Sequence, residues 1–318
     1  MNEATTFLHH NAVTVDVEDY FHVSAFRKCI PFDTWDSRPS RVEANTRRVL
    51  QLLAEFRVQA IFFILGWVAE RYPSLVREIL AAGHELGCHS YAHRLIYEMT
   101  PAEFRADTRR AIAAIEDAVG CGVRAYRAPT FSITARSLWA LEILAELGFQ
   151  MDSSIFPIPG GLYGIPGAPR RPFRIRLNGT SILEYPLPAV RVGPSNFPVT
   201  GGFYLRTLPT SLQVRWLKSM SRREQPAVLY FHPWELDPEQ PRLASRFGSK
   251  FYHYIGLNRT EFRLRHLLQA FRFGKLSECR AADAPVYRIG LVEAPKGQRA
   301  TLIPVAHAER GQITKSHS

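Results

Sequence analysis

The sequence predicts an α/β fold built around a parallel sheet. Short apolar segments of strand length alternate with longer segments in which apolar residues recur at helical spacing, and strands that alternate with helices form parallel sheets. The 318 residues are 46% hydrophobic and 22% charged, which is an ordinary globular composition, and the length suits one large domain or two smaller ones. The chain shows neither an internal repeat nor a low-complexity run.

Six short apolar segments are predicted as strands. The clearest is QAIFFIL at residues 59–65, because a continuous apolar run of this length is typical of a strand that is buried on both faces. The expected strands are residues 12–17, 59–65, 85–88, 124–127, 148–152 and 227–231.

Five segments are predicted as helices from apolar spacing and from signals at their ends. Thr100, Pro101 and Glu103 fit a capping box with proline at the first helical position, and Thr134 is placed as the N-cap of the next helix. The expected helices are residues 41–56, 73–83, 100–119, 134–148 and 259–271. The apolar face expected for the last helix consists of Phe262, Leu264, Leu267, Leu268 and Phe271.

Two regions depart from this alternation. Residues 157–209 are rich in proline and glycine and contain short alternating pieces, which predicts an irregular β-rich insertion with loops. After residue 295 the chain is polar and weakly patterned, and we expect it to fray.

The formal net charge of +11 has two interpretations. It can reflect a basic surface that attracts an anionic partner, or an arginine-rich background composition. The basic residues are dispersed, so we expect no nucleic-acid partner. The four cysteines lack CxxC spacing and are expected as free thiols. We recognise no signal peptide and no apolar stretch of transmembrane length, which predicts a cytoplasmic location.

Acidic and histidine side chains follow two of the predicted strands, where parallel α/β barrels build their active sites. Asp16, Glu18 and Asp19 come at the end of the first strand. Three such carboxylates would repel one another when buried, unless a cation neutralises them. His89 and His93 follow the third strand, and one helical turn would bring both imidazoles to the same face, where they could bind one divalent ion.

Arg127 ends another strand, and Asp16 is its expected partner, because a buried guanidinium needs a carboxylate that it can hold ionised. Pro129 fixes the turn that follows, so the N–H of Thr130 could face a developing oxyanion. His232 follows the last strand as a candidate general acid, and we pair it with Asp152.

Aromatic side chains lie beside these clusters. Phe131 and Trp234, with Tyr20 and Phe21, could stack on sugar faces or pack in the core, and the sequence leaves both interpretations open.

Taken together, these motifs resemble the NodB-type polysaccharide deacetylases, the family 4 carbohydrate esterases. The likeness runs in the right order over residues 11–233 and is carried by the H-[ST]-x-x-H motif from His89 to His93, by Arg127 with Pro129, by Asp152 and by His232. A closer likeness to the subfamily encoded beside exopolysaccharide and PEP-CTERM protein-sorting loci rests on residues 16–21, 127–132 and 251–271.

The resemblance implies a deformed (β/α) barrel that uses a divalent metal, with zinc expected, to remove acetyl groups from an amino sugar or a nascent exopolysaccharide. Asp16 would be the base and His232 the acid. The family's adjacent Asp-Asp pair is altered here, so the metal ligand beside His89 and His93 is Glu18 or Asp19. Strand alternation puts Glu18 on the same side as Asp16 and favours it.

The resemblance also implies a division into domains, a partner and a cellular location. Residues 1–280 would form the deacetylase domain, with a subfamily-specific region from about residue 235, and residues 281–318 a partly disordered extension. The partner would be a carbohydrate, and the protein would lie in the cytoplasm, at the inner membrane face and peripheral to the exopolysaccharide machinery.

Three alternatives stay open. Relatives of this fold open cyclic ureides, so the substrate could be a small non-sugar amide, as in allantoinases; a closed small pocket would favour this and a wide groove a sugar polymer. The protein could be a catalytically silent carbohydrate-binding module of an assembly machine, although such a module has no use for a base and an acid. A nucleic-acid-binding protein is supported by net charge alone.

Overall fold

The computed structural model describes residues 11–223, 225–245, 247–279, 281–294 and 297–306. Among them are twelve strands, ten of which form one sheet. The strands are β1 (Ala12–Val17), β2 (Ile61–Ile64), β3 (Glu85–Cys88), β4 (Ala125–Tyr126), β5 (Met151–Asp152), β6 (Phe173–Leu177), β7 (Thr180–Glu184), β8 (Ala189–Val192), β9 (Ser195–Pro198), β10 (Val228–Phe231), β11 (Val286–Ala294) and β12 (Gly297–Pro304).

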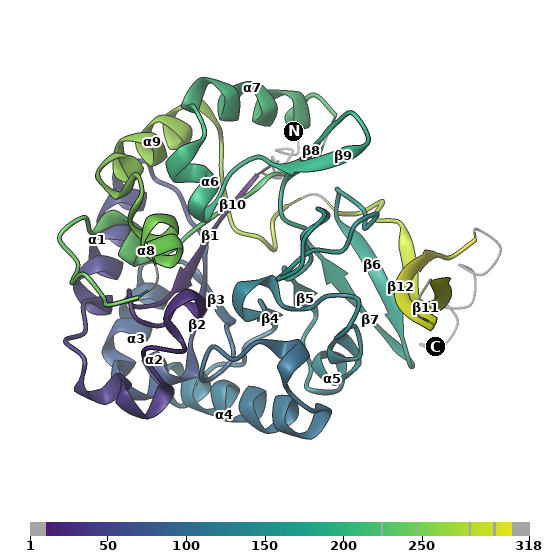
Figure 1. The fold of residues 1–318 in the computed structure, drawn as a ribbon, viewed down its shortest axis with the longest axis horizontal. Coiled ribbons are helices and arrows are strands. Elements are labelled where there is room, and N and C mark those ends of the chain that lie inside the picture. The colour runs from purple at the N-terminus through teal and green to yellow at the C-terminus, as the bar shows by residue number, and fades with distance from the viewer. Residues whose placement is uncertain (1–10, 224, 246, 280, 295–296, 307–318) are drawn as a thin grey trace, which may run out of the picture.

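The order of the large sheet is β10-β1-β2-β3-β4-β5-β7-β6-β11-β12. The strands from β10 to β7 pair in parallel, whereas β6 is antiparallel to β7 and β12 is antiparallel to β11. Figure 1 shows the parallel strands curving around the centre of the molecule with helices along the outside. The fold is the predicted deformed (β/α) barrel. Within the described residues β10 and β12 are the edge strands of the sheet, so strand-to-strand hydrogen bonds do not close the barrel.

Nine α-helices are present in the described part of the chain. They are α1 (Val42–Glu55), α2 (Gly66–Arg71), α3 (Pro73–Ala81), α4 (Pro101–Val119), α5 (Ala140–Glu146), α6 (Gly202–Thr207), α7 (Thr210–Ser221), α8 (Phe247–Tyr254) and α9 (Leu257–Ala270). The capping box predicted at Thr100 is confirmed, since Thr100 Oγ1 accepts the N–H of Glu103 and the Glu103 carboxylate accepts the N–H of Thr100. No helix in the described ranges is long and apolar enough to cross a membrane.

Two helix predictions need correction. Thr134 does not cap a helix: its Oγ1 accepts the N–H of Arg136 within a turn, and α5 begins only at Ala140. Phe262 does not join the apolar face of α9, because its side chain is 72% exposed, while Leu264, Leu267 and Leu268 are buried. A helix that packs on one side buries only part of its apolar residues.

The proline-rich region from residue 157 to 209 contains four short strands, as predicted, and β7 and β6 extend the main sheet beyond β5. The segment expected to fray contains β12, which pairs with β11 as a hairpin beside β6; residues 295–296 and 307–318 lie outside the described residues. All four cysteines are free thiols, as expected.

Candidate active site

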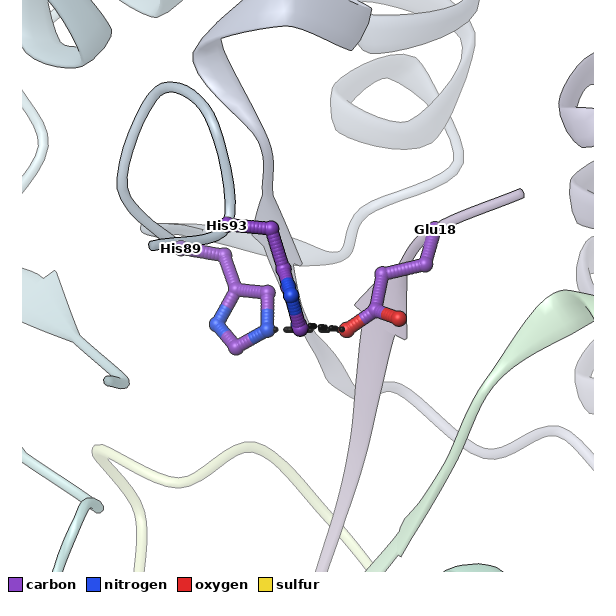
Figure 2. A group of neighbouring side chains, drawn as sticks. All are labelled: Glu18, His89 and His93. Atoms are coloured by element: carbon purple, nitrogen blue, oxygen red, sulfur yellow. Dashed lines mark hydrogen bonds and ion pairs between the residues drawn. The ribbon is translucent and has the colours of Figure 1, made fainter. Parts of the chain in front are cut away.

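Three side chains from two strand ends converge on one point (Figure 2). The Nε2 atoms of His89 and His93 each lie 3.0 Å from Glu18 Oε1, and all three side chains are buried. Glu18 follows β1 directly, and the two histidines lie in the loop after β3. Among the described residues, these three side chains form a group of potential metal ligands, whose ligand atoms all lie within 4.8 Å of one another.

The loop that presents the two imidazoles is not the helical turn that the spacing predicted. Ser90 and His93 have positive φ angles of 65° and 51°, a left-handed conformation that is costly for residues other than glycine. The loop is held by Asp107, whose Oδ2 accepts the N–H of Tyr91 at 2.8 Å. The two residues in left-handed conformation let the loop place His93 beside His89. Backbone strain of this kind is typical of functional sites.

The hydrogen bonds of the histidines indicate which atoms face the centre. His89 Nδ1 donates to the carbonyl of Arg127 at 2.8 Å, which directs the Nε2 atom at Glu18. A ring nitrogen and a carboxylate oxygen 3.0 Å apart need a proton or a metal cation between them. A ligating histidine whose other nitrogen donates to a carbonyl is the usual arrangement in metal sites.

The donor set fits a divalent metal ion. Two imidazole nitrogens and one carboxylate oxygen form the three-ligand set of catalytic zinc sites, and ligands bound at about 2.0–2.1 Å lie roughly 3.3 Å apart. Burial alone would raise the pKa of Glu18, but the facing imidazoles hold it well below its usual value. Glu18 is therefore an anion, as a ligand must be.

Asp19, the alternative ligand, lies outside this group because both of its oxygens hold the backbone. Its Oδ1 accepts the N–H of Tyr20 at 2.9 Å. Its Oδ2 accepts the Ser40 hydroxyl at 2.8 Å and the N–H groups of Arg41 and Val42 at 2.7 and 3.1 Å. The side chain therefore caps the first turn of α1.

The ion pair predicted between Asp16 and Arg127 is present and buried. Arg127 Nη1 donates to Asp16 Oδ1 at 2.8 Å and to Thr14 Oγ1 at 2.6 Å, and its Nη2 and Nε donate to the hydroxyl and carbonyl of Ser153. The guanidinium is thus fixed between β1 and the end of β5. The other oxygen of Asp16, Oδ2, lies 3.9 Å from Nε2 of His232, so the two side chains face each other.

The predicted pairing of Asp152 with His232 is wrong. The carboxylate beside His232 is Glu235, whose Oε2 lies 3.4 Å from His232 Nδ1 and accepts the His232 N–H at 3.1 Å. Glu235 in turn accepts a hydrogen bond from Arg206 Nε at 2.8 Å. Burial alone would lower the pKa of His232, but the surrounding carboxylates raise it to about 9.

Asp152 instead supports the loop that follows Arg127. Its Oδ1 accepts the Ser154 hydroxyl at 2.6 Å, and that hydroxyl accepts the N–H of Ala128 at 2.8 Å. Asp152 also pairs in register with Glu184 on the neighbouring strand β7. Burial, together with the adjacent Asp152 carboxylate, raises the pKa of Glu184 well above its usual value.

Thr130 and Phe131 both lie at the cavity with positive φ angles of 54° and 51°. The Thr130 hydroxyl is 2.7 Å from that of Ser24, which ties this turn to the segment after β1. The Phe131 ring packs edge-on against Tyr230 with centroids 4.9 Å apart, so Phe131 forms part of the cavity wall.

Trp234 lies between two imidazoles. Its ring stacks on His232 with centroids 5.2 Å apart and on His253 at 4.2 Å, and it lines the cavity while being almost fully buried. Tyr20 and Phe21, by contrast, are buried away from the cavity. The core interpretation is therefore correct for these two side chains.

The site opens into a cavity of about 650 Å³, within the range typical of small-molecule sites. Beyond the polar centre its wall includes a group of aromatic side chains, Tyr163, Phe203, Tyr204 and Tyr252. The sequence reasoning missed this wall, Arg206 and the role of Glu235. A signal for Glu235 was available, since it follows His232 by three residues within the same short turn, η5 (Pro233–Leu236).

Two family models match consecutive segments of the chain. Residues 29–151 match the family described as polysaccharide deacetylase. Over these residues the chain is similar to the polysaccharide deacetylase family. Residues 153–281 match a family described as a domain of unknown function (DUF3473). His89, His93 and Arg127 lie in the deacetylase segment and Arg206, His232 and Glu235 in the second; the matches begin after Asp16 and Glu18.

Proteins of known sequence and structure show the same similarity. The chain is 31% identical over 98 residues to a peptidoglycan-N-acetylglucosamine deacetylase of Bacillus cereus, covering 30% of this chain and 36% of that protein. It is 33% identical over 101 residues to a chitooligosaccharide deacetylase of a Bradyrhizobium species, covering 31% of this chain and 43% of that protein. The chain thus spans less than half the length of either relative.

A crystal structure from Mycobacterium smegmatis, provisionally assigned as a polysaccharide deacetylase, superposes with a TM-score of 0.56 at 19% identity. The match covers 84% of this chain and 86% of that one. A match of this extent must include residues of both matched segments, so the similarity of fold continues beyond residue 153.

Proposed function

We propose that this chain hydrolyses the N-acetyl group of an amino sugar in an oligo- or polysaccharide and releases acetate, with the help of a divalent metal ion. The observation that carries the proposal is the convergence of Glu18, His89 and His93 beside an arginine-paired Asp16, with His232 Nε2 only 3.9 Å from Asp16 and 3.8 Å from Glu18.

Glu18, His89 and His93 would hold the ion, for which zinc suits this donor set, and the ion would polarise the acetyl carbonyl and lower the pKa of a water molecule. Asp16 would accept the proton of that water at Oδ2. Arg127 holds the other oxygen, so the carboxylate is fixed in one orientation.

His232 would donate the proton that the leaving amine needs. Its raised pKa of about 9 means that the imidazole carries this proton at neutral pH. Its Nε2 lies 3.9 Å from Asp16 Oδ2, so a base that activates water and an acid that protonates the amine could act on the same amide bond. Addition of water to the carbonyl and cleavage of the C–N bond give acetate and a free amino sugar.

The family and its named relatives support a sugar substrate over a small non-sugar amide. The aromatic wall of the cavity supports it as well, because aromatic rings suit the apolar faces of sugars. An intact base and acid speak against a silent binding module. Zinc, the exopolysaccharide and PEP-CTERM subfamily, and a cytoplasmic location at the inner membrane face stay predictions, as does the division at about residue 280.

The proposal is tested by measuring acetate release from a panel of N-acetylated oligosaccharides. We expect activity in metal-loaded protein, loss on chelation, and recovery when the ion is restored. Asp16→Asn should lower turnover by about 10²- to 10⁴-fold, the usual size of a general-base contribution. Asp117→Asn, at an exposed position of α4, is the matched control and should keep full activity. Equal acetate release by loaded protein, chelated protein and Asp16→Asn on every substrate would refute the proposal.

A further inference from the structure

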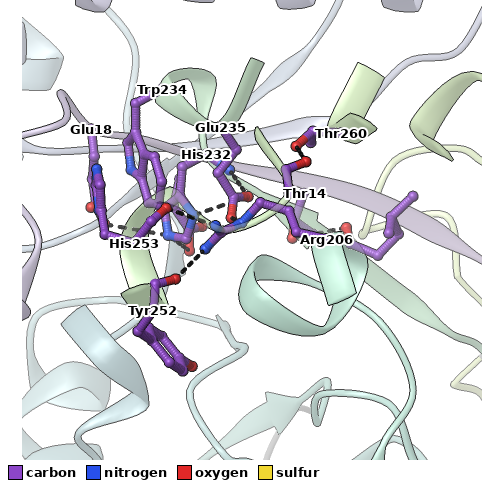
Figure 3. Close-up of polar contacts among 12 residues, drawn as sticks. Thr14, Glu18, Arg206, His232, Trp234, Glu235, Tyr252, His253 and Thr260 are labelled. Atoms are coloured by element: carbon purple, nitrogen blue, oxygen red, sulfur yellow. Dashed lines mark hydrogen bonds and ion pairs between the residues drawn. The ribbon is translucent and has the colours of Figure 1, made fainter. Parts of the chain in front are cut away.

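One arginine joins the wall of the cavity to the proton donor (Figure 3). Arg206 in α6 is only 3% exposed, and its Nε donates to Glu235 Oε1 at 2.8 Å. Its Nη1 donates to the carbonyls of His253 and Ile255, both at 2.7 Å, and its Nη2 donates to the carbonyl of Tyr252 at 3.1 Å. The guanidinium therefore binds one carboxylate and, at the same time, the last carbonyls of α8.

Glu235 passes this contact on to His232. One carboxylate oxygen is occupied by Arg206, and the other lies beside Nδ1 and accepts the N–H of His232. Glu235 is completely buried, and a buried carboxylate without a cation is strongly destabilised. Arg206 thus keeps Glu235 charged and in the position from which it orients the imidazole.

A second connection runs through stacked rings. His253 of α8 stacks on Trp234, and Trp234 stacks on His232. The neighbouring Tyr252 and the helix residues Gly248 and Ser249 line the cavity. The position of α8 is therefore linked to His232 both by hydrogen bonds and by packing.

We propose that Arg206 is a positioning residue for the proton donor His232 and that it couples the seating of α8, a wall of the substrate cavity, to that donor. This inference rests on the proposed function. Arg206 does for the acid what Arg127 does for the base, but its remaining donors hold a helix end instead of a strand. A planar guanidinium can bind the carboxylate and three carbonyls together, whereas a lysine ammonium has only three donors.

The test compares a substrate that needs the acid with one that does not. Hydrolysis of an N-acetylated oligosaccharide releases an amine, which must be protonated as it leaves. Hydrolysis of p-nitrophenyl acetate releases p-nitrophenolate, a stable anion that needs no proton. We expect Arg206→Gln and Glu235→Gln to lower the kcat for the amide by about 10- to 100-fold, part of a full general-acid contribution, and to change ester hydrolysis less than about 3-fold. Arg206→Lys, which keeps the charge beside Glu235, should restore part of the amide activity.

Arg263→Gln is the matched control. Arg263 donates to the carbonyls of Leu205 and Leu208 next to Arg206, so the variant removes a carbonyl-binding guanidinium without touching Glu235. It should leave both activities unchanged. Equal losses on amide and ester in Arg206→Gln, with no rescue by lysine, would make the role merely structural and overturn the proposal, as would unchanged amide turnover.

A spectroscopic measurement keeps the inference testable without activity. The ring resonances of His232, assigned with His232→Gln, should shift in Arg206→Lys and in Glu235→Gln but not in Arg263→Gln. Unshifted resonances would overturn the positioning role even if Arg206→Gln fails to fold. If the wild type releases no acetate from any N-acetylated sugar, the proposed function fails, and the resonances still decide whether Arg206 positions His232.

Discussion

The base side of the cavity is held by the sheet, whereas the acid side is held by helix ends and stacked rings. We define the base side as Asp16 with Arg127 together with the candidate ligands Glu18, His89 and His93. These residues lie at or directly after the ends of β1, β3 and β4, which are neighbours in one parallel sheet apart from the intervening β2. Their positions follow from strand pairing, the most regular part of the fold.

The acid side consists of His232, Glu235, Arg206, Trp234 and α8. Only His232 follows a strand, and the other members come from η5, α6 and α8. Both sides contain a buried arginine–carboxylate pair with the same 2.8 Å contact. The difference teaches that the proposed hydrolytic centre is fixed by neighbouring parallel strands, while the proposed acid is positioned by elements of the second matched segment, which also line the cavity.

The largest effect that can test this comparison concerns the ligands. Glu18→Gln should lose bound metal and lower acetate release by more than about 10³-fold, because metal polarisation contributes several kcal/mol to such reactions. Asp19→Asn should keep its metal and instead lose about 1 kcal/mol of unfolding free energy, since Asp19 caps α1. Metal content by atomic spectroscopy and urea denaturation measure the two outcomes. Full metal in Glu18→Gln with loss in Asp19→Asn would show that the base side is assigned wrongly.

Sequence reasoning succeeded on the base side because the decisive residues stand next to buried strands. The limits of β1 and β3 match the predicted segments, so the residues that follow them were located as well. The helical turn predicted for His89 and His93 is not formed. The left-handed φ angles at Ser90 and His93 are set by tertiary contacts, which the amino-acid composition of this segment does not reveal.

On the acid side fewer side-chain contacts could be predicted from the sequence, because they depend on the order of the strands in the sheet. Asp152 ends β5 and His232 follows β10, and pairing them assumes that these strands are close. The sheet order places β1 to β4 between them, so Asp152 bonds within its own loop and the nearby Glu235 takes its place. Arg206 could not be recognised, because its partners besides Glu235 are backbone carbonyls at the end of a helix that the sequence pattern did not predict.

A smaller effect should appear at the border between the two matched segments, where Asp152 and Glu184 pair across β5 and β7. The pKa of Glu184 is raised in the folded protein, so its contribution to stability is fully present below the unfolded pKa and is lost as pH rises through the folded value. Glu184→Gln removes this loss. The unfolding free energy of Glu184→Gln relative to wild type should therefore increase as the pH rises above the unfolded pKa of about 4.3.

Urea denaturation at several pH values measures this difference, and Glu142→Gln at an exposed position of α5 is the matched control. The control should follow wild type at every pH. If the unfolding free energy of Glu184→Gln ran parallel to that of wild type across this pH range, Glu184 would be ionised in the folded state. The border would then be held by charged groups instead of a proton shared between Asp152 and Glu184.

The smallest effect is expected on the outer surface of the second segment. Phe262 lies on α9 with 72% of its side chain exposed, so Phe262→Ser should change the unfolding free energy by less than about 0.5 kcal/mol. Leu264→Ala, two residues away and fully buried, should cost about 2–5 kcal/mol. Thermal and urea denaturation compare the two variants. A loss of more than about 1 kcal/mol in Phe262→Ser would mean that the ring is covered in solution, and α9 would then have a second apolar face, as the sequence pattern predicted.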